Sequence, residues 1–275
     1  MIVWHDGRLI DGPLALDPND RGLLLGDGAF ETIAVRGGKP VWLEDHLDRL
    51  LRTLIFLAIP AERETIETGV NAVLGEPNCI LRITVTRGPA GRGLGSDGTK
   101  PSVLIALSPW IEGLELAPAT LVTAKTRRNE HSPASRLKTL SYIDNILAAR
   151  EAAAAGAEDA LMLNTQGRVV CSTICNVFML RDGCLVTPPE SEGALPGIAR
   201  RHLIASAPDL GLSCEIRPIE PKELTGDAAL FLTNSLRLIR PVTELDGAPC
   251  APPGSLLGKL AGALRTPGRA DRVRA

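Results

Sequence analysis

Lys138 is the residue of this sequence best suited to covalent chemistry. It opens the motif Lys138-Thr-Leu-Ser-Tyr-x-x-Asn145. A lysine amine becomes a nucleophile and a proton carrier when desolvation lowers its pKa. An isolated lysine before a helix is usually a solvated surface charge. The chemistry of Lys138 therefore depends on whether other motifs supply partners for it.

Arg49 is a candidate for binding an anion. It lies in the motif His46-Leu-x-Arg49-Leu, where it offers a guanidinium that can bind phosphate or carboxylate oxygens. A salt bridge on the same helix, to Asp45 or Asp48, is the alternative interpretation.

Two further motifs also suit an anion. Leu195-Pro-Gly-Ile198-x-Arg200 places a glycine where a helix is expected to begin, and free N–H groups at such a point bind anions. The motif Thr233-Asn234-Ser235 offers a hydroxyl after an expected strand. A simple turn is the alternative at the second motif.

The elements that must position these residues are mixed. Apolar residues recur at helical spacing over Leu43–Ala58, while β-type residues alternate in several short runs. The glycines of the segment 22–28 predict a turn inside a sheet. We expect helices over 43–58, 62–74 and about 140–155, and strands over 80–87, 103–107, 120–125, 160–164, 169–170, 177–181, 185–187 and 229–232, with hairpin turns at Gly167 and Asp182-Gly183.

The length of 275 residues suits two domains. Two prolines and a glycine interrupt the β-type pattern at 109–118, which is typical of a linker. We expect a small α+β domain over 1–108, the linker over 109–118, a second domain over 119–265 and a frayed basic tail over 266–275.

Composition excludes several classes of protein. The 30 basic and 32 acidic residues give a net charge of −2, which with 3% aromatic residues argues against a nucleic-acid surface. No apolar run reaches the roughly 18 residues of a membrane span. The cysteines are too sparse for a disulfide framework, and neither they nor the histidines show metal-ligand spacing. We therefore expect a cytoplasmic protein with reduced thiols, no metal and a small-molecule partner.

Taken together and in this order, the motifs resemble the class-IV, fold-type IV pyridoxal-phosphate enzymes. This family includes branched-chain and D-amino-acid aminotransferases and 4-amino-4-deoxychorismate lyase. The resemblance implies an α+β fold like that of D-amino-acid aminotransferase, with a small N-terminal α/β lobe, a larger C-terminal β-rich lobe and a homodimeric assembly. The matching segments also include Arg21-Gly-x-x-x-Gly-Asp-Gly-x-Phe-Glu-Thr and Gly167-x-Val-x-Cys-x-x-x-x-Asn176-x-Phe.

The resemblance assigns roles to individual residues. Lys138 would form an aldimine with pyridoxal 5'-phosphate and then act as the acid and base. The family commonly has threonine where Ala199 stands, so one hydroxyl donor is missing and backbone donors or Ser235 must compensate. The implied cofactor-binding residues are Arg49, Lys138, Cys171, Asn176, Gly197, Ile198, Ala199, Asn234 and Ser235.

Cys171 is the sharpest departure from the family. A glutamate normally stands there, five residues before the asparagine, and keeps the pyridine nitrogen protonated. A neutral thiol is a weak donor and acceptor, so the cofactor ring should be a weaker electron sink. Weak transamination, specialisation in elimination, and a degenerate member of altered activity all remain open.

A second group of residues favours the lyases. Arg87-Gly-x-x-Gly91-Arg92-Gly93 resembles their arginine- and glycine-rich loop, although Leu94 stands where they usually have an aromatic residue. The final loop, Leu232-Thr-Asn-Ser-Leu-x-x-x-Arg-Pro-Val242, is also similar to theirs. A substrate with two carboxylates suits arginine clamps, for which the candidates are Arg82, Arg87, Arg92 and Arg237.

The first hypothesis is a homodimeric lyase that converts 4-amino-4-deoxychorismate to 4-aminobenzoate and pyruvate, a step of folate synthesis. The second is a class-IV aminotransferase for branched-chain or D-amino acids. The third is a non-catalytic relative that retains the fold, motivated by Cys171 and Ala199.

Overall fold

The computed structural model describes residues 2–96, 98 and 100–265, and the tail predicted over 266–275 lies outside the described residues. The chain forms two compact units. The first runs to Ile111 and also includes Leu137–Ser141, and the second comprises Glu112–Arg136 and the part from Tyr142 onward.

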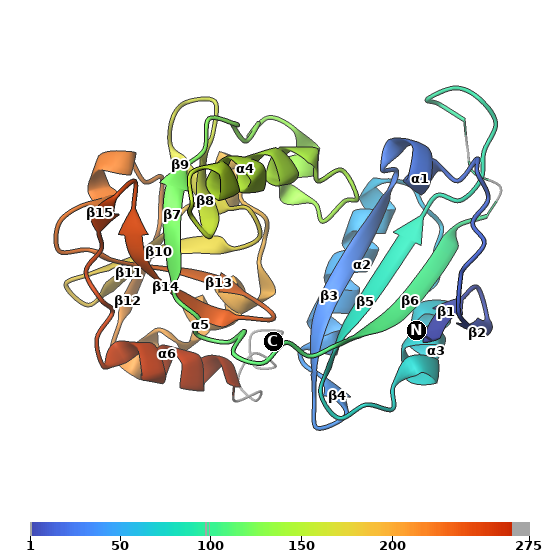
Figure 1. The fold of residues 1–275 in the computed structure, drawn as a ribbon, viewed down its shortest axis with the longest axis horizontal. Coiled ribbons are helices and arrows are strands. Elements are labelled where there is room, and N and C mark those ends of the chain that lie inside the picture. Colours follow the sequence, from blue (N-terminus) through green and yellow to red (C-terminus); the bar gives the residue numbers. More distant parts are fainter. Residues whose placement is uncertain (1, 97, 99, 266–275) are drawn as a thin grey trace. The chain divides into compact units, whose positions relative to one another are not determined.

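The first unit is built on one sheet in which the described strands follow the order β2-β1-β6-β5-β3-β4, all neighbours being antiparallel (Figure 1). Its strands are β1 (Ile2–His5), β2 (Arg8–Asp11), β3 (Gly28–Arg36), β4 (Lys39–Pro40), β5 (Cys79–Thr86) and β6 (Ser102–Pro109). Its helices are α1 (Arg21–Leu25), α2 (Leu43–Phe56) and α3 (Arg63–Val73).

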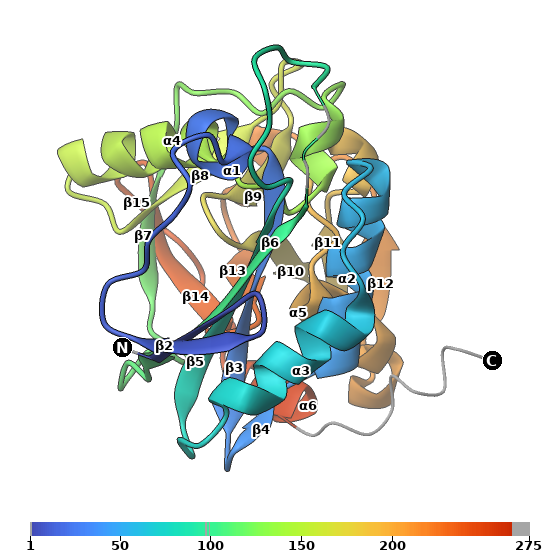
Figure 2. The same ribbon diagram turned by 90° about the vertical axis from the view of Figure 1, so that its right-hand side faces the viewer.

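Helices α2 and α3 cover one face of this sheet, as Figure 2 shows. The apolar residues of α2 recur at helical spacing, so Leu47, Leu50 and Leu54 are buried on one side of the helix. They pack with alternate residues of the strands, such as Ile33 and Ile83. The helix predicted over 43–58 is confirmed and ends at Phe56.

The glycine-rich segment before β3 is more ordered than the predicted turn. The Asp20 side chain caps the start of the short helix α1, and Gly26 ends it with a φ of 66°. Left-handed backbone of this kind favours glycine. The expected turn inside a sheet is therefore corrected to a capped helix that leads into β3.

The segment Leu137–Ser141 belongs to the first unit because it pairs with β3. The Phe30 N–H donates to the Lys138 carbonyl at 3.0 Å, and the Leu140 N–H donates to the Gly28 carbonyl at 2.9 Å. The domain expected over 119–265 included this segment. The structure differs because backbone hydrogen bonds to β3, rather than sequence position, decide where these residues pack.

The second unit contains a sheet that closes on itself. The described strands follow the order β12-β11-β10-β13-β14-β7-β8-β9, and β9 pairs again with β10. The strands are β7 (Ala119–Thr123), β8 (Asp159–Leu163), β9 (Val169–Ser172), β10 (Asn176–Arg181), β11 (Cys184–Thr187), β12 (Ser213–Ile216), β13 (Ala229–Asn234), β14 (Leu238–Leu245) and β15 (Ala248–Pro249). The α-helices are α4 (Ile143–Ala154), α5 (Ile198–Ser206) and α6 (Leu256–Arg265), and short 3-10 turns lie at Pro133–Arg136, Glu190–Glu192, Pro208–Leu210 and Pro221–Leu224.

The core of the second unit comes from alternate strand residues. Val177, Leu230 and Leu232 are among the buried apolar side chains of one cluster, and α4 packs its Ala148 against a second cluster with Met162. The predicted turns at Gly167 and Asp182-Gly183 adopt positive φ as hairpin turns require. The α+β fold class is confirmed.

No helix in the described part of the chain is long and apolar enough to cross a membrane. In the same residues no group of three or more His, Cys, Asp or Glu side chains could hold a metal ion.

Candidate active site

Lys138 lies beside an aromatic ring in the first unit. Its Nζ is 4.1 Å from the centroid of the Phe30 ring, and the guanidinium carbon of Arg82 is 3.6 Å from the same centroid. The hydrogen bonds to β3 fix the Lys138 carbonyl and the Leu140 N–H that follows it. The next side chain, Thr139, has a buried hydroxyl without a hydrogen-bond partner among the described residues. Lys138 therefore has a rigid backbone and a neighbouring hydroxyl in need of a partner.

Arg49 is held by Glu31 in the same unit. Its Nε and Nη2 donate to the two Glu31 carboxylate oxygens at 2.8 and 2.7 Å, and His46 Nδ1 lies 2.6 Å from Glu31 Oε2. Glu31 and His46 are fully buried, and Arg49 is nearly so. This two-oxygen contact uses one edge of the guanidinium and leaves Nη1 outside the pair.

The charges of this cluster follow from burial and proximity. Burial raises the pKa of the Glu31 carboxyl, but the positive charge of Arg49 and the His46 ring outweigh it and hold that pKa at about 2. Burial also lowers the pKa of His46, so the neutral ring is favoured. A neutral ring that donates from Nδ1 leaves Nε2 as an acceptor, and Nε2 is buried without a partner among the described residues.

Asp27 anchors the glycine-rich loop after β5 from within the first unit. Its Oδ2 accepts from Arg21 Nε and Arg87 Nε, both at 2.8 Å. Arg21 then donates to the carbonyl oxygens of Gly93 and Leu94, each at 2.9 Å. Partial burial raises the pKa of Asp27, but the two guanidinium groups lower it further than burial raises it. The loop is thus tied to α1 through Arg21.

The predicted substrate arginines of the first unit have different surroundings. Arg87 is engaged by Asp27 and by the carbonyl oxygens of Leu57 and Ala58, so binding a substrate would require some of these contacts to break. Arg92 is exposed in the glycine-rich loop. Arg82 lies over the Phe30 ring, and the Lys138 amine lies near the same ring.

In the second unit, α5 begins at an uncapped N-terminus. Gly197 is the N-cap residue, no side chain of the described chain caps it, and the first turn holds no acidic residue. Ile198 and Ala199, the first two residues of the helix, are buried. A helix start of this kind carries partial positive charge and suits an anion. The helix predicted to open at Gly197 is confirmed.

Asn176 fixes the segment that leads into α5. Its Nδ2 donates to the Leu195 carbonyl at 2.9 Å. A Cβ at Gly197 would lie 1.9 Å from Asn176 Oδ1, so a larger residue would force the asparagine or the helix start to shift. The close approach explains why this glycine and this asparagine occur together. Asn176 thus sets the position of the α5 N-terminus.

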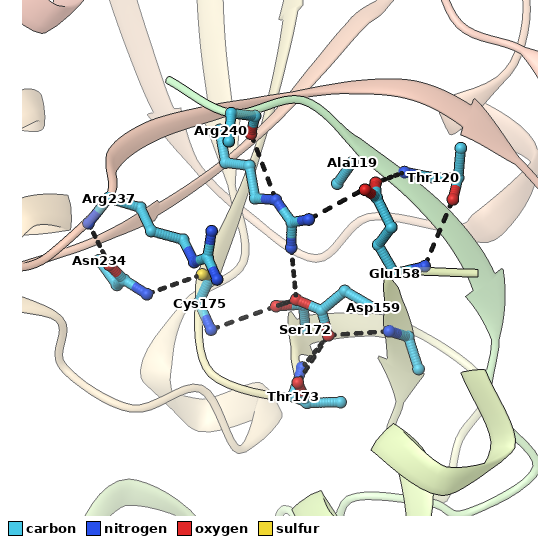
Figure 3. A network of polar contacts seen from close by, with 12 residues as sticks. Ala119, Thr120, Glu158, Asp159, Ser172, Thr173, Cys175, Asn234, Arg237 and Arg240 are labelled. Atoms are coloured by element: carbon cyan, nitrogen blue, oxygen red, sulfur yellow. Dashed lines mark hydrogen bonds and ion pairs between the residues drawn. The ribbon is translucent and has the colours of Figure 1, made fainter. Parts of the chain in front are cut away.

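The turn after β13 is organised by Asn234. Its Oδ1 accepts from the N–H groups of Leu236 and Arg237 at 3.0 and 2.8 Å, and its Nδ2 donates to Cys175 Sγ at 3.1 Å (Figure 3). The hydroxyl of Thr233, just before it, is buried without a partner in the described chain. Ser235 is partly buried in this turn.

Cys171 is buried in β9. Burial raises the pKa of its thiol to about 11, although the charge of Arg128 acts to lower it. The thiol is therefore neutral near neutral pH. Arg128 is itself buried, and it donates to Asn145 Oδ1 and to the Ser135 carbonyl, while its Nε has no partner among the described residues.

The sequence did not mark several of these residues as site candidates. Glu31 and Thr233 stand inside matched motifs, yet their burial comes from pairing across a sheet. The available signal for Glu31 was a charged residue inside an otherwise apolar strand, Gly28–Val35. Arg128 carried no such signal, because its burial depends on contacts with α4.

The comparison with protein families decides the family of this chain. The model of amino-transferase class IV matches residues 28–245. The chain belongs to this family. Class-IV aminotransferases depend on pyridoxal 5'-phosphate, and the chain is an enzyme of this family that uses that cofactor.

Individual relatives divide between two activities. A protein named putative branched-chain-amino-acid aminotransferase from Methanocaldococcus jannaschii is 32% identical over 90% of this chain and 88% of its own length. An aminodeoxychorismate lyase from Bacillus subtilis is 29% identical over 89% of this chain and 87% of its own length. Both are similar throughout, so overall similarity does not separate lyase from aminotransferase.

A solved structure supports the fold and the cofactor class. A hypothetical aminotransferase from Mycobacterium tuberculosis, in its pyridoxal-phosphate-bound form, superposes with a TM-score of 0.84 and 26% identity. The match covers 99% of this chain and 100% of that chain. The fold-type IV architecture expected from the motifs is confirmed.

Proposed function

We propose that the protein is a pyridoxal-phosphate lyase that converts 4-amino-4-deoxychorismate to 4-aminobenzoate and pyruvate. The neutral, buried thiol of Cys171 is the observation that carries this proposal. A thiol of this kind holds a proton on the pyridine nitrogen poorly, which weakens the electron sink that transamination needs. Elimination from this substrate gains aromaticity, so it tolerates a weaker sink.

Several groups of the chain suit the cofactor phosphate. The uncapped start of α5 at Gly197, Ile198 and Ala199 suits the phosphate dianion, and the orphaned Thr233 hydroxyl supplies a donor that Ala199 lacks. Ser235 adds a second hydroxyl. Arg49, whose guanidinium is held by Glu31, adds a positive charge.

Lys138 is the proposed catalytic residue. When bound, the cofactor supplies an electron-withdrawing ring to the carbon that bears the substrate amine. Lys138 Nζ would remove the proton from that carbon, and the bond between the ring and the enolpyruvyl oxygen would break, which makes the ring aromatic. The leaving enolate would take up a proton, returned by Lys138 or by solvent, and become pyruvate. The backbone hydrogen bonds to Phe30 and Gly28 hold the lysine in place for this transfer.

The two substrate carboxylates would be bound by arginines. The candidates are Arg82, Arg87, Arg92 and Arg237. Arg87 is engaged by Asp27 and two carbonyl oxygens, and Arg82 donates to the hydroxyls of Thr84 and Thr32. Guanidinium groups bind carboxylates through two parallel hydrogen bonds. Arg87 remains a candidate only for a state in which those contacts break.

An aminotransferase for branched-chain or D-amino acids is the second candidate. The 32% identity to a protein named as a branched-chain aminotransferase favours it. It would use the same Lys138, the same phosphate contacts and a keto-acid acceptor.

The deciding experiment supplies purified protein and pyridoxal phosphate with 4-amino-4-deoxychorismate, and separately with amino acids and 2-oxoglutarate or pyruvate. We expect 4-aminobenzoate and pyruvate in equal amounts without a keto acid, and no product from Lys138→Ala. Robust keto-acid-dependent amino transfer without lyase turnover would contradict the proposal. Cofactor binding without either reaction would favour the non-catalytic relative.

We also propose that the chain acts as a homodimer in the cytoplasm. Light scattering of the purified protein tests the dimer, and fractionation of the source cells tests the compartment. A monomer of full activity would contradict the first assignment.

A further inference from the structure

Asp159, at the start of β8, is a buried carboxylate that fixes the turn after β9. Its Oδ1 accepts from the N–H of Ala160 at 2.8 Å and from the Thr173 hydroxyl at 2.6 Å, and its Oδ2 accepts from the Ser172 hydroxyl at 2.9 Å (Figure 3). Arg240 Nη1 lies 3.7 Å from Oδ2. Buried carboxylates need partners of this kind, and here the partners include the first residues of the turn.

The same turn is closed by Cys175. Its N–H donates to Ser172 Oγ at 3.2 Å, and its carbonyl accepts from the Ser172 N–H at 2.8 Å. Burial raises the pKa of the Cys175 thiol to about 12, so the group is neutral and its sulfur keeps a lone pair. That sulfur accepts from Asn234 Nδ2 at 3.1 Å.

Asn234 carries this connection into the next turn. While its Nδ2 contacts the sulfur, its Oδ1 accepts from the N–H groups of Leu236 and Arg237. Arg240 lies farther along the chain, on β14, and contacts Asp159. We call Asp159, Ser172, Cys175, Asn234 and Arg240 the polar brace.

The polar brace gives the Asn234 side chain a structural role. Asn234 was expected to contact the cofactor, but Oδ1 is shared by two backbone donors and Nδ2 reaches a sulfur. Its amide is therefore engaged in holding the turn. The groups that this turn leaves for a ligand are the hydroxyls of Ser235 and Thr233.

We propose that Cys175 is a positioning residue, whose sulfur couples the turn at 172–175 to the turn at 234–237 so that Ser235 and its neighbours meet the cofactor phosphate. The inference rests on the proposed function, because that function assigns the phosphate to this turn. Cys175 itself does not touch the phosphate. It acts through Asn234, and the coupling exists before any ligand binds.

The test compares Cys175→Ala, which removes the acceptor, with Cys175→Ser, which keeps one. Cys79→Ala is the matched control, since Cys79 is a buried thiol of the first unit and lies outside the polar brace. Amide hydrogen exchange of Leu236 and Arg237, measured by NMR without ligand, reports the coupling. Affinities for pyridoxal phosphate and for pyridoxal, which lacks the phosphate, show whether the coupling affects phosphate binding.

We expect Cys175→Ala to speed exchange of both amides and to weaken pyridoxal phosphate binding roughly fivefold, the scale of one modest hydrogen bond. Pyridoxal binding should not change, Cys175→Ser should restore both readouts, and Cys79→Ala should alter neither even if it lowers the melting temperature. Equal losses for pyridoxal and its phosphate would indicate a merely structural role and overturn the proposal.

The exchange measurement separates this inference from the proposed function. Unchanged exchange in Cys175→Ala would overturn the coupling whether or not any cofactor binds. Faster exchange in a protein that binds no pyridoxal phosphate would refute the proposed function and the phosphate role of the turn together, while the coupling between the turns would stand.

Discussion

Glu31 holds Arg49 along one edge of its guanidinium, with Nε and Nη2 each donating to a separate carboxylate oxygen. The pair is buried in the first unit, and His46 contacts the same carboxylate. A carboxylate placed in this way fixes the direction of the arginine while leaving Nη1 outside the pair. The arrangement therefore holds the Arg49 side chain in one orientation.

Glu31→Gln should destabilise the fold strongly. Removing one partner of a buried ion pair leaves the other charge uncompensated and costs about 3–5 kcal/mol. Urea unfolding near neutral pH measures the loss, and Glu64→Gln, at an exposed position of α3, is the control. A loss no larger than that of the control would contradict the role of the pair.

The same pair predicts a dependence of stability on pH. The Glu31 carboxyl has a pKa of about 2 in the fold against an ordinary value of 4.5. Its contribution to the free energy of unfolding is therefore present above about pH 4.5 and is lost as the pH falls toward 2. The Glu31→Gln variant should lack this component. Unfolding free energies of both proteins across that range measure the difference, and parallel curves would contradict it.

Asp27→Asn should loosen the glycine-rich loop after β5. The neutral amide keeps the shape but loses the charge that holds Arg21 and Arg87, and Arg21 in turn holds the carbonyl oxygens of Gly93 and Leu94. Limited trypsin digestion should therefore cleave after Arg92 faster in the variant. Asp11→Asn on β2 is the control, and equal cleavage rates would show that Asp27 does not anchor the loop.

Gly197→Ala should disturb the start of α5. A Cβ there would lie 1.9 Å from Asn176 Oδ1, so either the asparagine or the helix must move. We expect a lower melting temperature and weaker binding of pyridoxal phosphate. Gly258→Ala in α6, where a Cβ would meet no atom within 4 Å, is the control. Unaltered cofactor affinity would argue against a phosphate site at this helix start.

Cys171→Glu should raise any transamination half-reaction. The glutamate would supply the proton partner that the neutral thiol lacks, and the buried charge of Arg128, which acts on position 171, favours its ionised form. Stopped-flow conversion of the bound cofactor by an amino acid, without a keto acid, measures the rate. An unchanged or slower conversion would contradict the electron-sink explanation.

Much of the fold was predictable because its helices and strands follow strong local patterns. The α2 helix and the turn at Gly167 are set by apolar spacing and by a positive φ, which are local properties. The placement of Lys138 could not be predicted from local sequence. It lies with the first unit because its carbonyl accepts from the Phe30 N–H and the Leu140 N–H donates to Gly28, contacts between residues far apart in the sequence.

In the candidate site, too, some features follow from local sequence and others only from long-range contacts. Gly197 at a helix start and Ser235 in a turn follow from motif and composition. The partner of Arg49 could not be predicted in this way, because Glu31 lies on β3 and meets Arg49 only where α2 packs against that strand. The engagement of Arg87 by Asp27 was equally hidden, because it depends on how a loop returns to α1.

The most direct test of the account is the trapping of the cofactor on the protein. Purified protein is incubated with pyridoxal phosphate, its absorbance spectrum is recorded before and after borohydride, and peptides of the reduced sample are weighed. The account predicts an absorbance band that borohydride removes and a single phosphopyridoxyl adduct on Lys138, absent from Lys138→Ala. No adduct, or an adduct on another lysine, would contradict the assignment of Lys138 on which the proposed chemistry depends.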